Sequence, residues 1–254
     1  RYLLSGGMAR SGIKHLIVDE MQDYSYVQFL LLSKLFSCPM TILGDREQQA
    51  VPGKPNAQEL CKEVFGKQAK LLTLRKSYRS TTEISQFANQ IAGIEGEEAF
   101  ERHGTPPEYL LSATRQEMTE QLKERLSFTL RKKEEGMAAG FDTIAVLTKT
   151  WEEALLLYAE LKEKLPVSLL SAESSHMEQG IVITTFYLAK GLEFDSVHVV
   201  YVQKDTYFSN YHRQILYIAA TRALHELTLY GFGERSAIAV TGQKKALRFQ
   251  SNPL

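Results

Sequence analysis

The sequence predicts an α/β fold in which parallel β-strands alternate with helices. Three observations support this prediction. Short runs rich in Val, Ile and Leu recur along the chain, helical stretches separate most of them, and several are followed directly by charged or polar residues. The predicted strands are residues 15–18, 40–43, 70–74, 143–147, 180–185, 197–202 and 227–230.

Helices are predicted over residues 24–36, 81–92, a stretch around 118–126, and 151–165. The first is apolar on most faces, so we expect it to be well buried. Thr81 or Thr82 is a suitable N-cap for the second. Met118, Leu122 and Leu126 recur every four residues, which predicts one apolar stripe on the third helix.

The composition of the 254 residues is that of a globular protein, with 44% hydrophobic and 24% charged residues. No apolar run approaches the roughly 20 residues that a membrane-spanning helix needs, so we expect no membrane partner. Cys38 and Cys61 form no CxxC pattern, which favours a reducing cytoplasmic setting. Thirty basic residues balance thirty acidic ones, which argues against a uniformly basic nucleic-acid coat but not against a local basic groove.

Three carboxylates follow the first predicted strand in the stretch HLIVDEMQD: Asp19, Glu20 and Asp23. Ligands of open parallel sheets bind at the carboxyl ends of the strands, where clustered acids need a cation such as Mg²⁺ on a nucleotide. Asp19 would then hold the magnesium shell, and Glu20 would orient or deprotonate an attacking water. In the alternative interpretation the acids only cap the helix that begins at Tyr24, which Asp23 alone could do.

Two further strands are also followed by polar residues. After residues 40–43 comes GDREQQ, in which Gln48 could contact a γ-phosphate or position the water; its alternative role is that of an exposed turn residue. In LRKSYRS, Arg79 could stabilise charge on a phosphoryl group, an effect worth about 10³–10⁵ in rate. Tyr78 could stack on a base.

The C-terminal half contains two more such pieces. The stretch TTFYLAKGLEFDSV follows a buried strand and carries Lys190, Gly191 and Glu193, where Gly191 permits a tight backbone turn. The stretch ILYIAATRA reads as an apolar helix whose far end carries Arg222. A single arginine at a helix end ordinarily complements the helix dipole.

In this order the five pieces resemble the later motifs of the UvrD/Rep-type superfamily 1 helicases. DEMQD resembles their Walker B box, GDREQ the motif usually written GDPDQ, and KSYRS the motif usually written NYRS. TTFYLAKGLEF is similar to T-x-H-x-x-KGLEF, and YIAATRA to the final arginine-bearing motif. The matched stretch from Asp19 to Arg222 covers most of the chain, and a chance match to all five is very unusual.

The resemblance implies RecA-like parallel sheets with flanking helices, in a partial first lobe plus a complete second lobe. Residues 1–76 would be the C-terminal part of the first RecA-like motor domain, and residues 77–254 the second. The implied activity is that of an ATP-dependent DNA helicase, a P-loop NTPase that couples ATP hydrolysis to translocation on single-stranded DNA. Its cofactors would be ATP and Mg²⁺, bound between the two lobes.

Carried over by position, the resemblance also implies roles in ATP hydrolysis. Asp19 would bind the magnesium ion through water, and Glu20 would orient or deprotonate the attacking water. Gln48 would sense the γ-phosphate. Arg79 would touch the γ-phosphate, and Arg222 would act as the second arginine finger.

Further roles concern the base, the sugar and the nucleic acid. Tyr78 would stack on adenine, and Glu193, next to the Gly191 turn, would lie near the sugar and phosphates. Thr185 and Lys190 would face the nucleic-acid groove or support its loop.

The sequence departs from the family pattern at three places. Tyr187 and Leu188 replace the usual His and a small residue in a loop that helps to grip single-stranded DNA, and Ser77 replaces Asn. No G-x-x-x-x-G-K-[ST] occurs in the chain. The nearest lookalike, at residues 53–55, fails because Pro55 has neither an N–H nor a hydroxyl to offer.

Truncation is the simplest account of the missing P-loop: the N-terminal part of the same protein would precede Arg1, and the isolated chain would be inactive as an ATPase.

The distance from Arg79 to Lys190 is too short for the inserted subdomain of UvrD and Rep. The HelD-like ATPases, which act on RNA polymerase, fit this length better, and ATRALHEL resembles them. The alternative function is therefore an ATPase that remodels or releases RNA polymerase with little unwinding.

Some aromatic and histidine residues are expected to be structural. His15 and His198 lie in predicted apolar strands, so core packing is expected for both. Tyr201, Tyr207 and Phe208 are expected to pack or to lie in loops, although a base-stacking platform is an alternative for them.

Overall fold

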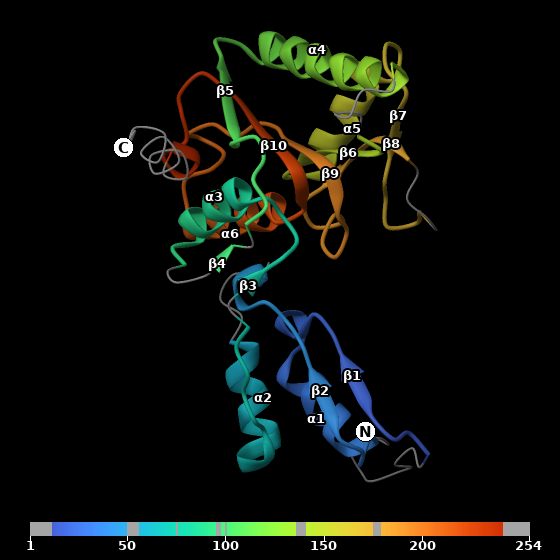
Figure 1. The fold of residues 1–254 in the computed structure, drawn as a ribbon, viewed down its shortest axis with the longest axis vertical. Helices are drawn as coiled ribbons and strands as arrows, with labels where there is room; N and C mark the ends of the chain where they lie inside the picture. The colour runs from blue at the N-terminus through green and yellow to red at the C-terminus, as the bar shows by residue number, and fades with distance from the viewer. Residues whose placement is uncertain are drawn as a thin grey trace. The chain divides into compact units, whose positions relative to one another are not determined.

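The computed structural model describes residues 12–49, 56–74, 76–94, 98–99, 101–135, 141–174 and 179–240 (Figure 1). The lookalike at residues 53–55 lies outside them. The chain divides into two compact units, Arg1–Leu74 and Arg75–Leu254, and the division falls close to the predicted domain boundary. Within the described part of the chain, no helix combines the length and apolarity needed to cross a membrane.

The first unit, Arg1–Leu74, contains a small parallel sheet. Strand β1 (Leu16–Val18) pairs with β2 (Met40–Ile42), as the apolar runs predict. The crossover between the strands holds a 3-10 turn and α1 (Tyr26–Leu35), and α2 (Ala57–Phe65) follows β2. Because the two strands run in the same direction, the polar residues that follow each of them emerge at one edge of the sheet.

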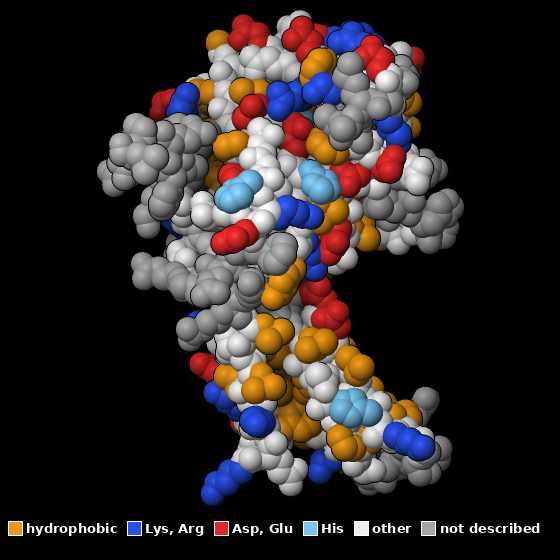
Figure 2. Space-filling view, viewed as in Figure 1, with side chains coloured by type: hydrophobic (Ala, Val, Ile, Leu, Met, Phe, Trp, Pro, Cys, Tyr) orange, Lys and Arg blue, Asp and Glu red, His pale blue; other side chains and the backbone are white. Residues whose placement is uncertain are grey.

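Two expectations about this unit are wrong. Phe29 is the buried residue of α1, whereas Val27 is 54% exposed, because a two-stranded sheet is too narrow to cover several faces of a helix. Residues 70–74 form no strand, and Leu74 is 88% exposed, since no described strand pairs with them. Figure 2 accordingly shows hydrophobic side chains gathered on the visible surface of this unit.

The second unit, Arg75–Leu254, is built on a six-stranded, all-parallel sheet with the strand order β5-β10-β9-β6-β8-β7. This architecture confirms the predicted parallel α/β fold. A separate pair of short parallel strands joins β3 (Lys76–Ser77) to β4 (Glu98–Ala99). The strands of the main sheet are β5 (Glu108–Ser112), β6 (Thr143–Thr148), β7 (Val167–Leu169), β8 (Gly180–Thr185), β9 (Phe194–Val199) and β10 (Ala223–Phe232).

Helices with described bounds flank this sheet: α3 (Thr82–Ala92), α4 (Arg115–Glu134), α5 (Trp151–Leu161) and α6 (Asn210–Ala220). Figure 1 shows α4 and α5 on one side of the sheet and the packed pair α3 and α6 on the other. The predicted stripe of Met118, Leu122 and Leu126 is fully buried in the core between α4, α5 and the sheet. Thr81 caps α3, as predicted, by accepting a hydrogen bond from the Ile84 N–H.

His198 lies in β9 and is fully buried, which confirms the prediction of core packing. Its ring nitrogens lie 3.2 Å from Ser196 Oγ and 3.1 Å from the Tyr230 hydroxyl. Burial, together with the positive charge of Arg125, lowers the pKa of His198 from 6.5 to about 3. His15, in contrast, is exposed just before β1, so core packing is wrong for it. Tyr201 and Tyr207 are buried, whereas Phe208 is 68% exposed.

His198 should make the stability of this unit depend on pH. Because its folded-state pKa lies below its unfolded value, its contribution is fully present above about pH 6.5 and is lost as the pH falls towards about 3. Between these values the unfolded chain holds one extra proton, so the slope is about 1.4 kcal/mol per pH unit. Urea unfolding followed by the fluorescence of Trp151 in α5 measures it. The neutral variant His198→Gln should lack this part of the slope; equal slopes would contradict the assignment.

Candidate active-site residues

Polar side chains that follow β1 and β2 form one hydrogen-bonded network. Gln22 Nε2 donates to Glu20 Oε2, and the Asp45 N–H donates to Gln22 Oε1 at 3.1 Å. Gln48 Nε2 donates to Asp45 Oδ2 at 2.8 Å, and Gln48 is only 6% exposed. Gln48 is therefore not an exposed turn residue. The structure connects Glu20 to Gln48 through two intermediate residues, Gln22 and Asp45, the second of which bonds to Gln22 by its backbone N–H.

Gln22 is the centre of this network, and sequence analysis did not select it. Its side chain is 2% exposed, packed beneath the turn that follows β2. A Cβ at Gly44 would lie 2.5 Å from Gln22 Oε1 and 2.9 Å from the Met21 backbone nitrogen, so only glycine allows this approach. The one sequence signal was that the two strands end in polar residues at the same edge, which requires some contact between them.

The acidic turn itself has an unusual backbone. Glu20 adopts the left-handed conformation, with φ 54° and ψ 43°, which costs a non-glycine residue about 1–2 kcal/mol. Asp19 is exposed, and its Oδ1 accepts a hydrogen bond from the Glu20 N–H at 2.8 Å. The N-cap of α1 is Ser25, whose Oγ accepts from the Gln28 N–H, so the interpretation of Asp23 as the helix cap is wrong.

The donor set of this turn fits a nucleotide-bound divalent cation. Carboxylate oxygens are the ligands that Mg²⁺ prefers, and it commonly takes only one or two of them together with water and phosphate oxygens. Such a site needs no cluster of three or more acidic, His or Cys ligands, and the described residues contain none. The sequence contains no G-x-x-x-x-G-K-[ST] loop that would cradle the phosphates of such a nucleotide.

In the second unit, Arg79 and Glu193 form an ion pair. Arg79 Nε lies 2.5 Å from Glu193 Oε1, and the two side chains are 43% and 44% exposed. Arg79 precedes α3, and Glu193 directly precedes β9. Tyr78, next to Arg79, is 64% exposed. Half-exposed ion pairs contribute about 0–1 kcal/mol, so Arg79 can exchange its partner at little cost.

Arg222 lies in the turn between α6 and β10 and is almost completely buried, at 1% exposure. Its Nη1 donates to Leu192 O at 3.3 Å, its Nε to Ile218 O at 3.3 Å and its Nη2 to Thr221 Oγ1 at 3.1 Å. Its own carbonyl accepts from the Phe194 N–H at 3.0 Å.

Arg222 therefore contacts the residues on both sides of Glu193. The side chain holds Leu192 and the backbone holds Phe194, while Glu193 between them pairs with Arg79. The structure thus brings three predicted residues of this unit together at the amino ends of β9 and β10.

The loop between β8 and β9 carries the remaining predicted residues. Thr185 ends β8 and is 7% exposed, and its Oγ1 accepts from the Leu188 N–H at 3.3 Å. Tyr187 is 62% exposed, Lys190 is half-buried, and Gly191 has φ +83°. Because β8 and β9 both run parallel to β6, the loop begins at the carboxyl edge of the sheet and ends at the amino edge. The structure therefore separates Thr185 from Glu193.

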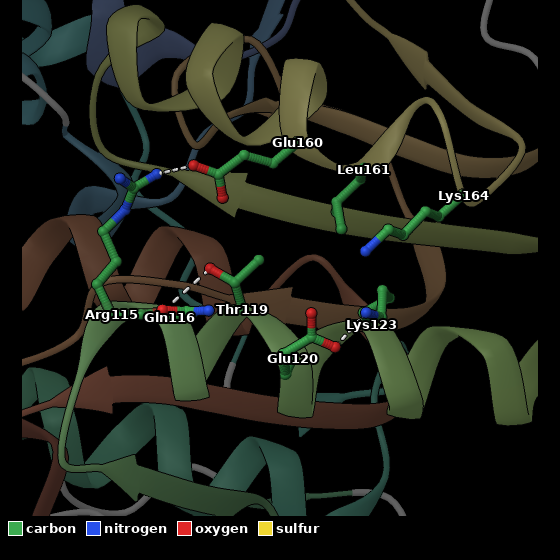
Figure 3. A pocket seen from close by; sticks show the side chains of 8 residues that line it. All are labelled: Arg115, Gln116, Thr119, Glu120, Lys123, Glu160, Leu161 and Lys164. Carbon is green, nitrogen blue, oxygen red and sulfur yellow. Dashed lines mark hydrogen bonds and ion pairs between the residues drawn. The ribbon is translucent and has the colours of Figure 1, made fainter.

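A cavity of about 420 Å³ lies away from these residues, between α4 and α5 (Figure 3). Charged side chains line much of it, and Arg115 pairs there with Glu160, and Glu120 with Lys123. No predicted site residue lines the cavity. The mixed charges and the internal ion pairs give it no evident preference for one kind of ligand.

Comparison with known proteins agrees with the motifs. Residues 180–230, from β8 into β10, match the family model described as the UvrD-like helicase C-terminal domain. A protein of Acanthamoeba polyphaga mimivirus, named as a candidate ATP-dependent DNA helicase, R568, is 25% identical over 246 residues. The alignment covers 85% of this chain but 34% of the viral protein, so the chain spans about a third of the length of that curated relative.

A solved structure gives the same result. The C-terminal domain of a possible DNA helicase from Lactobacillus plantarum WCFS1 is 29% identical and superposes with a TM-score of 0.55. The match covers 66% of this chain and 96% of that domain. The resemblance to UvrD/Rep-type superfamily 1 helicases is confirmed: residues 180–230 match the UvrD-like helicase C-terminal domain, and the six-stranded parallel sheet is consistent with a RecA-like C-terminal lobe of a helicase.

Proposed function

We propose that the protein is an ATP-driven nucleic-acid motor that couples ATP hydrolysis to translocation on single-stranded DNA. The observation that carries this proposal is the convergence of Arg79, Glu193 and Arg222, of which Glu193 and Arg222 lie in the residues that match the UvrD-like helicase C-terminal domain. An arginine paired with a half-exposed carboxylate suits the binding of a polyanion, because a phosphate can replace the carboxylate as the partner of the guanidinium. In this proposal residues 1–76 belong to the first RecA-like motor domain and residues 77–254 form the second.

Arg79 would act as the mobile group. Its ion pair with Glu193 is half-exposed, so a γ-phosphate can compete for the guanidinium at a cost of about 1 kcal/mol or less. Glu193, once released, can accept hydrogen bonds from sugar hydroxyls. Tyr78 presents an exposed ring on which adenine can stack.

Arg222 would act differently, because its side chain is buried and hydrogen-bonded to the loop that carries Glu193. Each hydrogen bond of a charged group contributes about 1.5–3 kcal/mol, so Arg222 cannot leave these acceptors freely. We propose that it contributes positive charge as the second arginine finger, and that contact with a phosphate requires a change in its hydrogen bonds to Leu192 and Ile218.

Asp19, Glu20 and Gln48 would serve the hydrolytic step. A bound Mg²⁺ would supply charge neutralisation on the phosphates. Asp19, exposed at the end of β1, would hold the water shell of the ion, and Glu20 would orient the attacking water and accept its proton. Gln48 would contact the γ-phosphate. A change in its position would then affect Glu20, because hydrogen bonds through Asp45 and Gln22 connect the two residues.

Thr185, Tyr187 and Lys190 would contact nucleic acid. The exposed ring of Tyr187 can stack on a base in place of the usual His, and Lys190 can contact a backbone phosphate. The same exposed Tyr187 suits a protein surface, which favours as an alternative a HelD-like ATPase that remodels or releases RNA polymerase with little unwinding.

Steady-state ATP hydrolysis by the full-length protein tests the proposal. We expect Mg²⁺-dependent turnover that single-stranded DNA stimulates, together with displacement of one strand from a tailed duplex. The 254-residue chain should show no turnover, because it has no P-loop lysine or backbone N–H cradle for the phosphates. Turnover that responds to RNA polymerase but not to DNA, without strand displacement, would replace the motor by the HelD-like alternative.

A further inference from the structure

Arg102 reaches the backbone on both sides of the arginine cluster. Its Nη2 donates to the carbonyl oxygen of Arg79 and, at 2.9 Å, to that of Leu224. Leu224 is the second residue of β10 and lies two residues after Arg222. One guanidinium nitrogen therefore bridges the segment that carries Arg79 and the strand that begins beside Arg222.

The backbone around Arg102 is itself anchored at the start of α3. The Thr82 N–H donates to Arg102 O at 2.8 Å, and the Gly104 N–H donates to Glu83 Oε2 at 2.8 Å. His103 Nδ1 lies 2.9 Å from Glu83 Oε1. Hydrogen bonds therefore fix the backbone of residues 102–104, from which the side chain of Arg102 extends.

A second contact reinforces the bridge. Ser80 Oγ donates to Ala223 O at 2.6 Å, and Ser80 is 5% exposed. Ser80 is therefore bonded directly to the carbonyl of Ala223, and Arg79 is linked through Arg102 to the carbonyl of Leu224. A guanidinium directs its N–H groups in fixed planar directions, so the bridge sets orientation as well as distance.

We propose that Arg102 is a positioning residue for Arg79. It holds the backbone of Arg79 against the start of β10, so that the Arg79 guanidinium stays beside Glu193 and within reach of the phosphate that it binds in the proposed function, on which this inference rests. Arg102 itself touches no reacting atom. A misplacement of about 1 Å can cost about 10²-fold in rate, so a backbone tie of this kind can limit turnover.

Arg213 provides a matched control. Its Nη1 donates to Ile91 O at 2.8 Å and so ties the start of α6 to the end of α3. Like the bonds of Arg102, this bond runs from an arginine to a backbone carbonyl. The bonds of Arg102 lie near the start of α3 and the end of α6, whereas the bond of Arg213 lies at the end of α3 and the start of α6. A purely structural role for Arg102 predicts that Arg102→Ala and Arg213→Ala behave alike.

Kinetics of the full-length protein separate the two roles. Arg102→Ala should lower kcat for ATP hydrolysis about ten- to a hundredfold, with KM for ATP within about twofold of wild type. Arg102→Lys should recover part of the loss, because an ammonium can still donate to one carbonyl. Arg213→Ala should keep the wild-type kcat even if its melting temperature falls. An unchanged kcat in Arg102→Ala, or equal losses in both alanine variants, would overturn the proposal.

Hydrogen exchange on the 254-residue chain gives a readout that does not depend on activity. The amides of residues 79–82 should exchange faster in Arg102→Ala than in wild type or Arg213→Ala. If the full-length wild type does not hydrolyse ATP, the proposed function fails. The exchange measurement then still tests whether Arg102 holds the backbone of Arg79 against β10. Unchanged exchange in Arg102→Ala would refute the positioning role even in a protein that is an active ATPase.

Discussion

Replacing Arg79 by alanine in the full-length protein should lower kcat for ATP hydrolysis by about 10³-fold or more. The reason is that the variant loses the one arginine of the cluster that can turn to a phosphate at little cost, since its ion pair with Glu193 is half-exposed. Binding of ATP should weaken much less than turnover, because a finger arginine acts mainly on charge that develops during the reaction. Single-turnover and steady-state ATPase assays measure the two effects separately.

Arg115→Ala is the matched control for this experiment. Arg115 also pairs with a glutamate, Glu160, and the two side chains are 43% and 39% exposed, almost as in the Arg79 pair. Figure 3 shows this pair at the cavity between α4 and α5. The control should retain wild-type turnover. A turnover of Arg79→Ala equal to that of Arg115→Ala would remove Arg79 from the catalytic machinery.

The second large effect concerns stability. Arg222→Ala in the 254-residue chain should lower the free energy of unfolding of unit Arg75–Leu254 by about 3 kcal/mol or more. The truncation removes a buried guanidinium and leaves the carbonyl groups of Leu192 and Ile218 without these donors. Each such buried acceptor costs about 1–3 kcal/mol. Urea unfolding followed by the fluorescence of Trp151 reports on this unit, because the chain has a single tryptophan.

Arg79→Ala serves as the control in the unfolding experiment, since its half-exposed ion pair contributes about 1 kcal/mol or less. Arg222→Lys keeps the charge but cannot reproduce the planar set of three bonds, so it should lie between wild type and Arg222→Ala. If Arg222→Ala unfolds at the urea concentration of the wild type, the buried hydrogen bonds do not hold the loop, and Arg222 is free to move as Arg79 does.

These two arginines differ in what the motifs can predict about them. KSYRS and YIAATRA place both residues in one cluster by resemblance, and the structure does bring them close to Glu193. Nothing in either stretch indicates that Arg79 is half-exposed and Arg222 buried. The difference arises because the loop before β9 packs over the end of α6, more than 25 residues away in the chain.

Whether a strand could be predicted depends on its place in the sheet. Strands β6 and β8 lie inside the sheet, where both faces are covered, so their continuous apolar runs identify them. Within this six-stranded sheet, the two strands that were not predicted, β5 and β7, are its edges, and partly exposed residues interrupt their apolar pattern. Residues 70–74 are apolar enough for a strand but have no described neighbour with which to pair.

By itself the sequence determined the class of the fold, the family resemblance and the residue types that follow each strand, because these depend on local composition and on the order of motifs. Only the tertiary structure decided that Gln22 connects Glu20 to Asp45 and Gln48, and that Arg102 ties Arg79 to β10. The contact between Gln22 and Asp45 and both contacts of Arg102 join residues at least 23 positions apart in the chain. Their existence depends on how strands and helices pack, which local patterns do not specify.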